Sequence, residues 1–96
     1  MYRHETAQMR KITRSPDFLL VVDPHSHAAR RMAERDIAKF EVERVVKAGA
    51  VVMIETDPDG SERWRVAGYA EGKRIEVVVE PLPPSMMVLV TAIRVG

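Results

Sequence analysis

A histidine and two arginines recur at four-residue spacing in residues 26–37, as His27, Arg31 and Arg35. The unperturbed pKa of histidine is about 6.5, so an imidazole can accept or donate a proton near neutral pH. The planar guanidinium group of arginine presents paired donors that match a phosphate, which lysine cannot copy. Four residues make about one helical turn, so all three side chains share one side of a helix. The segment therefore predicts an acid–base group, His27, beside two arginines that could bind a phosphate.

The helix that presents these residues is predicted over residues 26–35, with Ser26 as its N-cap. At 100° per residue, His27, Arg31 and Arg35 span about 80°. Small apolar residues fill the neighbouring sector of about 140°. They are Ala28, Ala29, Met32 and Ala33. The three polar side chains therefore border the predicted core, although both arginines could instead lie along it and pair with glutamates of this or the next helix.

The remaining sequence predicts the elements around this helix. Residues 18–22 are apolar and favour a short buried strand, and residues 40–48 repeat valine at helical spacing. Gly49 is placed to end that second helix in the left-handed conformation. Turn residues at 57–60 and 70–73 then separate strands expected over residues 51–56, 61–69, 74–80 and 86–93. We expect an α+β fold with two short helices packed on one face of a mainly antiparallel sheet of four to five strands.

The alternation of apolar and polar residues over residues 61–80 predicts a register for the second hairpin. Trp64 is expected opposite Val79, and Val66 opposite Val77, on the face that packs against the helices. The indole of Trp64 is interpreted as core packing rather than as a base-stacking platform.

The other side of this hairpin is expected to face solvent and to extend a basic surface. Its members would be Arg63, Arg65 and Tyr69, joined from the last strand by Arg94. An alternative stays open, because the same register sets Arg63 opposite Glu80 and Arg65 diagonal to Glu76 and Glu80. These arginines could therefore form cross-strand ion pairs only.

Composition limits the class of protein. The 96 residues include 15 Lys and Arg against 14 Asp and Glu, so the net charge of +1 gives little long-range attraction to an anionic partner. We predict a basic leader over residues 1–15, part of which could be helical, and a single domain over residues 16–96. With no cysteine, a disulfide framework and a thiolate metal site are excluded. The apolar run 18–22 is too short to cross a membrane, and we expect a cytoplasmic protein with no membrane partner.

Histidines raise the question of a metal. His25 and His27 are separated by one residue at the predicted helix start, and His4 lies in the leader. No carboxylate spacing completes a recognised metal motif around them. We therefore expect no metal site and no other cofactor.

The same helical segment carries a recognisable motif. Ser26-His27-Ala28, Arg31-Met32, Arg35 and Ile37 match H-A-x-x-R-M-x-x-R-x-I, the hallmark of a widespread bacterial and archaeal family of small domains of unknown function, which this chain resembles. Further matches in residues 49–52, 63–68, 72–78 and 90–92 extend the likeness to about residues 18–95. The family usually has glycine at the position of Asp36 and a serine-type cap at that of Ala38. The turn between the two helices is therefore expected to differ here.

The resemblance implies a fold and a function. Members look like toxin partners of two-gene toxin–antitoxin loci and are similar in predicted fold to the RelE, BrnT and MqsR group of small ribonucleases. This implies a RelE-like domain that acts as a metal-independent endoribonuclease on RNA, above all mRNA, free or on the ribosome, with a cognate antitoxin as its protein partner. Such cleavage needs a base for the 2′-hydroxyl and cations for the charged phosphorane. His27, Arg31 and Arg35 would be catalytic. The RNA-binding residues would be Arg63, Arg65, Tyr69 and Arg94.

Two other interpretations of the motif remain. The chain could be a non-catalytic module that binds nucleic acid or protein in a regulatory complex. Alternatively the motif is structural, with His27 bonded to backbone at the helix start and the arginines tying helices to sheet. The last strand is apolar on both sides, which favours either cover on both faces or use in a homo-oligomer.

Overall fold

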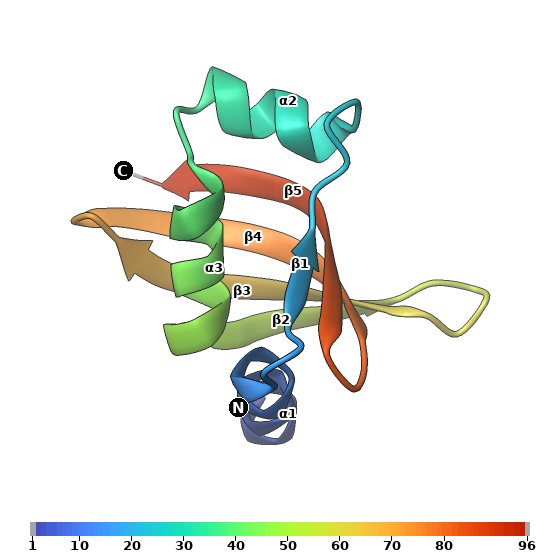
Figure 1. The fold of residues 1–96 in the computed structure, drawn as a ribbon. Coiled ribbons are helices and arrows are strands. Elements are labelled where there is room, and N and C mark those ends of the chain that lie inside the picture. The colour runs from blue at the N-terminus through green and yellow to red at the C-terminus, as the bar shows by residue number, and fades with distance from the viewer. Residues whose placement is uncertain (1, 96) are drawn as a thin grey trace.

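The structure, a computed structural model, describes residues 2–95 and contains three helices and one five-stranded mixed sheet over that range (Figure 1). Along the chain the elements are α1 (Arg3–Arg14), β1 (Leu19–Val21), α2 (His27–Glu34), α3 (Lys39–Ala48), β2 (Ala50–Thr56), β3 (Glu62–Ala70), β4 (Lys73–Leu82) and β5 (Met86–Val95). The strand order is β1-β5-β4-β3-β2. The expected α+β class is confirmed, whereas the expectation of only two helices was wrong.

Strand pairing follows the alternation in the sequence. The pairs Trp64–Val79 and Val66–Val77 join β3 to β4 as predicted. All neighbouring strands are antiparallel except β1 and β5, which run parallel, so the sheet is mixed. A parallel pair needs a crossover connection, and α2, α3 and the β2–β4 meander supply it between β1 and β5.

One face of the sheet carries the core. α3 lies across this face (Figure 1), where Val42, Val45 and Val46 are fully buried together with Trp64. Repetition of valine at helical spacing produces this stripe, as the sequence predicts. α2 packs on β5, which lies toward the edge of the sheet opposite to β2.

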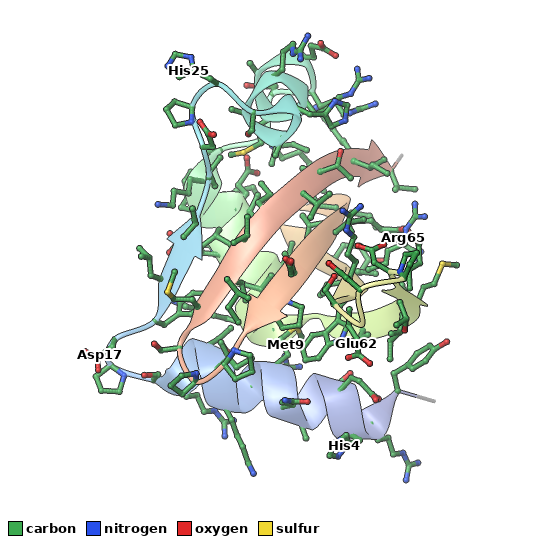
Figure 2. The ribbon with its side chains drawn as sticks, turned by 90° about the vertical axis from the view of Figure 1, so that its right-hand side faces the viewer. His4, Met9, Asp17, His25, Glu62 and Arg65 are labelled. Carbon is green, nitrogen blue, oxygen red and sulfur yellow. The ribbon has the colours of Figure 1, made fainter. Side chains whose placement is uncertain are left out.

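The basic N-terminal segment forms α1, which packs on α3 and β2. Met9 points from α1 into the molecule (Figure 2), and Met9 and Ile12 are 0% and 2% exposed. Arg10 Nη2 donates hydrogen bonds to the carbonyl oxygens of Ala48 at 3.2 Å and Gly49 at 2.6 Å. The last carbonyls of a helix have no partner within it, so Arg10 satisfies the end of α3.

Gly49 does not have the left-handed conformation that we expected. Its φ is −79°, and it is required for a different reason. A Cβ atom at Gly49 would lie 2.6 Å from the carbonyl oxygen of Val45 and closer still to that of Ala67. Gly68 has the same role in β3, because a Cβ there would lie 3.2 Å from Gly49 Cα. The two glycines therefore let α3 and β3 approach closely.

A residue with a left-handed backbone lies in the turn between α2 and α3. Asp36 has φ of +54°. The backbone N–H of Ile37 donates to the carbonyl of Met32 at 2.9 Å, and that of Asp36 donates to Ala33 at 3.4 Å. These two bonds form a Schellman motif, whose left-handed position favours glycine. Asp36 thus occupies a position that suits a glycine better.

α3 begins without a side-chain acceptor at its N-cap, Ala38. Glu41 compensates by turning back, so that its Oε1 accepts from the Ala38 backbone N–H at 2.9 Å. Its Oε2 lies 2.7 Å from Lys73 Nζ, and the carboxylate is only 4% exposed. The Ala38 N–H, and then the Lys73 ammonium, hold the pKa of Glu41 below its ordinary value.

Within residues 2–95, none of the helices has the length and apolar character that crossing a membrane requires.

Candidate functional site

The position of α2 is fixed at its start and along one side. Ser26 caps the helix as predicted, since its Oγ accepts from the Ala29 N–H at 3.1 Å. Ala28 and Met32 are buried against the core. Ala33, which we expected in the apolar sector, is exposed. The buried stripe of α2 is therefore narrower than its sequence indicates.

His27 and Arg31 lie together on the exposed side of α2. Arg31 Nε donates a hydrogen bond to His27 Nε2 across 3.3 Å. An imidazole nitrogen accepts a hydrogen bond only when it carries no proton, so His27 Nε2 is the acceptor in this contact. His27 is exposed, and the Arg31 side chain is 38% exposed. Solvent and a ligand can therefore reach both groups.

The guanidinium of Arg31 is also held from its other side. Its Nη1 lies 2.8 Å from Glu34 Oε2, in an ion pair whose members are three residues apart on α2. One glutamate partner of the kind left open by the sequence is thus present. Glu34 is 50% exposed, and exposed pairs of this type contribute about 0.2–1 kcal/mol. A phosphate can compete with such a partner.

Arg35 has a different environment from Arg31. Its Nη1 donates to the backbone carbonyl of Ala92 at 3.2 Å, in β5. Arg35 therefore ties α2 to the edge of the sheet, as the structural interpretation of the motif expects for the arginines. The same hydrogen bond places the side of α2 that carries Arg35 next to the edge of β5. His27, Arg31 and Arg35 form a row in which only the first two are in contact.

The sheet arginines are paired with acids. Arg65 Nε lies 2.6 Å from Glu76 Oε1, which confirms the diagonal ion pair foreseen from the register. Arg63 Nε lies 3.4 Å from Asp57 Oδ2 rather than beside Glu80, because the β2–β3 turn brings Asp57 closer. Arg65 points to the side of the sheet away from α3 (Figure 2). Tyr69, on the same side, is 69% exposed.

Arg94 does not adjoin that surface. Its partner in the register is Ile75, which is fully buried on the helix-covered face. Residues that pair across antiparallel strands point to the same side, so Arg94 lies on the opposite side of the sheet from Arg63, Arg65 and Tyr69. Its positive charge acts on the Glu41 carboxylate.

The histidines do not form a common site. His4, on α1, and His25, in the loop before α2, lie at opposite ends of the molecule (Figure 2). Across residues 2–95, no three histidine or carboxylate side chains are arranged to bind a metal ion.

Comparison with known protein families gives one match. A family model described as a domain of unknown function (DUF4258) matches residues 25–94, from the loop before α2 to the end of β5. The chain belongs to this family. No match was found among curated proteins or among solved structures. α1 and β1 lie outside the matched segment of the DUF4258 domain.

Sequence reasoning placed Glu34 of this DUF4258 domain among the ordinary solvent-facing residues and did not include it in the site. The structure shows that Glu34 forms an ion pair with Arg31. Its i,i+3 spacing from Arg31 was the signal that could have identified it, because residues at that spacing are neighbours on a helix.

Proposed function

We propose that this protein is a metal-independent endoribonuclease with its centre on α2. The observation that carries the proposal is the contact between Arg31 Nε and His27 Nε2, 3.3 Å apart on an exposed surface. It pairs an unprotonated imidazole nitrogen with a cation that can bind phosphate. General base catalysis and charge stabilisation of the phosphorane require such groups.

RNA binding changes the hydrogen-bond partners of both His27 and Arg31. When RNA binds, the 2′-hydroxyl replaces Arg31 as the donor to His27 Nε2, and Arg31 turns its N–H toward a non-bridging phosphate oxygen. His27 then takes the 2′ proton as the 2′ oxygen attacks phosphorus. The bond to the 5′ oxygen breaks, water protonates that oxygen, and the products are a 2′,3′-cyclic phosphate and a 5′-hydroxyl end.

Arg35 has a positioning role in this proposal. Its hydrogen bond to the Ala92 carbonyl fixes the position of α2 relative to β5. This keeps His27 and Arg31 beside the edge of the sheet. Arg65 and Arg63 are neutralised by Glu76 and Asp57, so they add little to the binding of phosphates. Tyr69 is exposed and can stack on a base.

The biological setting that we propose is a toxin–antitoxin pair. The resemblance in the motif of α2 to toxin-like small domains supports it, as does an order of strand, two helices and an antiparallel meander that suits a RelE-like fold. RNA, most of all mRNA, is then the substrate, and a cognate antitoxin is the partner.

A second candidate function is a non-catalytic binding module. The ion pairs of Arg63 and Arg65 favour it, since they leave the sheet face nearly neutral and suited to contact with a protein.

Growth after induced expression separates the two functions. We expect the wild-type chain to arrest growth and His27→Ala to abolish the arrest at equal protein level. Arg30→Ala is the matched control, because Arg30 is exposed on the side of α2 that carries Ala29 and Ala33. Arrest by His27→Ala that equals the wild type contradicts the proposal, and normal growth with the wild type supports the binding module.

A further inference from the structure

The face of the sheet opposite α3 carries an apolar stripe. In β1 and β5, Leu20 and Met87 point into the core, so the residues that alternate with them point outward. The stripe, with one residue from β4, consists of Leu19, Val21, Val78, Met86, Val88 and Ile93. Leu19 is 49% exposed and the other five are partly exposed. We call this surface the open-face stripe.

The stripe is not explained by the fold. The described helices pack on the other face and on the edges of the sheet, so no element of residues 2–95 covers these side chains. A strand that is apolar on both sides is typical of a strand covered on both faces. A contiguous exposed apolar surface bordered by charges is typical of a protein interface.

A basic border lies along one side of the stripe. α2 runs beside β5 (Figure 1), and the bond from Arg35 to Ala92 sets the row of His27, Arg31 and Arg35 at the edge of β5. In Figure 2, blue-tipped side chains project from α2 on the side of the molecule where Arg65 lies.

On the other side of the stripe, in β4, the acidic border is Glu80. Glu80 pairs with Val88 in the register, and Glu76 pairs with Ile93, so both glutamates share the open face with the stripe. Glu76 is neutralised by Arg65 at 2.6 Å and Arg74 at 3.6 Å. Glu80 takes part in none of the ion pairs found within residues 2–95.

This order of charges makes the face complementary to itself. Rotation by a two-fold axis that runs parallel to the strands over β5 exchanges the two sides of the stripe. The basic border of one copy then faces the acidic border of the other. An axis across the strands would instead set arginines against arginines. Closed two-fold pairing is the commonest form of homo-oligomer, and packed sheets tolerate a small angle between their strands.

We propose that the open face is a homodimer interface in which stripe packs on stripe and Arg31 of each copy exchanges its exposed partner Glu34 for Glu80 of the other copy. The stripe supplies the apolar area, and the two charge pairs fix the orientation. The inference stands apart from the proposed ribonuclease. Since both use Arg31, RNA and a second copy compete for α2.

Sedimentation velocity over about 1 to 300 μM, a range that covers weak to moderate association, tests the dimer. We expect a monomer–dimer equilibrium for the wild type and a dissociation constant raised at least about tenfold in Val88→Glu, because the new charge is buried at the centre of the interface. Phe40→Glu adds the same charge to a side chain on α3 that is 54% exposed, and it should associate as the wild type does. A wild type that stays monomeric, or a Val88→Glu variant that dimerises unchanged, overturns the proposal.

Charge exchange tests the orientation without altering the stripe. Glu80→Arg and Arg31→Glu should each weaken the dimer, and the double variant should restore it, because it rebuilds the pair with reversed signs. A double variant that is as weak as the two single effects combined overturns the assigned pairing. His27→Ala should still dimerise, so failure of the ribonuclease and failure of the dimer are distinguishable.

Discussion

Arg31 holds its guanidinium between two residues of its own helix, with Nη1 2.8 Å from Glu34 Oε2 and Nε 3.3 Å from His27 Nε2. The glutamate therefore competes directly with any phosphate for this cation. An exposed pair of this kind contributes up to about 1 kcal/mol, which corresponds to a change of up to about fivefold in affinity.

Glu34→Gln should accordingly tighten the binding of single-stranded RNA by about two- to fivefold, measured by fluorescence anisotropy at low salt. Glu43→Gln removes the same charge from α3 and should change affinity less. Equal effects from the two variants would show that only net charge matters and that Arg31 does not bind the phosphate.

Substitutions at Gly49 test whether glycine is required there for close packing or for its backbone conformation. Because its φ is −79° and a Cβ would collide with the carbonyl oxygens of Val45 and Ala67, Gly49→Ala should lower the free energy of unfolding by about 1–3 kcal/mol. Gly49→Asn should be at least as harmful, since asparagine tolerates a left-handed backbone but is larger. Gly68→Ala should be milder, because the nearest atoms to its Cβ, Gly49 Cα at 3.2 Å and Val45 Cγ1 at 3.3 Å, are farther away than the carbonyl oxygens that a Cβ at Gly49 would meet. Chemical denaturation measures all three, and recovery of stability by asparagine would restore the left-handed explanation.

Asp36 is a site for a stabilising substitution. With φ of +54° at the end of α2, Asp36→Gly should raise the free energy of unfolding by about 0.5–1 kcal/mol, because glycine adopts this conformation without steric strain. In a domain of this size the melting temperature should rise by about 2–8 °C. Asp36→Ala is the control and should give no gain. A glycine variant less stable than the wild type would mean that the aspartate side chain contributes in its own right.

Glu41 links stability to acid pH. Its pKa is lowered in the folded protein by the Ala38 N–H and by Lys73, from an ordinary value of 4.5. The folded state therefore binds this proton less readily than the unfolded state does, and the stabilisation is fully present above about pH 4.5 and lost as the pH falls through the lowered pKa.

Glu41→Gln keeps an acceptor for Ala38 but leaves Lys73, which is 21% exposed, without its carboxylate. We expect a loss of about 1–3 kcal/mol near neutral pH and a smaller difference from the wild type near pH 3, measured by urea unfolding across pH. A difference that is independent of pH would show that the ion pair does not contribute to stability.

The second hairpin could be predicted in detail, because alternation with period two fixes both the faces and the register, as in the pair Trp64–Val79. α1 was harder to foresee. Its apolar residues are few, and the partners of Arg10, the carbonyls of Ala48 and Gly49, become available only once α3 has formed. The spacing within α2 likewise indicates that His27 and Arg31 meet.

Contacts between residues far apart in the sequence could not be predicted in the same way. Arg35 reaches Ala92, 57 positions later, and no local pattern encodes that contact. The close approach of Gly49 to β3 is of the same kind, because a glycine at a helix end equally fits a left-handed cap.

The central claim, that His27 and Arg31 cleave RNA without a metal, is tested most directly by the rate of RNA cleavage in EDTA. A 5′-labelled RNA is incubated free in EDTA and, without EDTA, in a translation extract, because ribosomes need Mg²⁺. We expect the wild type and Arg30→Ala to yield fragments ending in a 2′,3′-cyclic phosphate, and His27→Ala and Arg31→Ala each to lower the rate by about 10²-fold or more. Intact RNA in both settings with the wild type, or cleavage by His27→Ala at the wild-type rate, would contradict the claim.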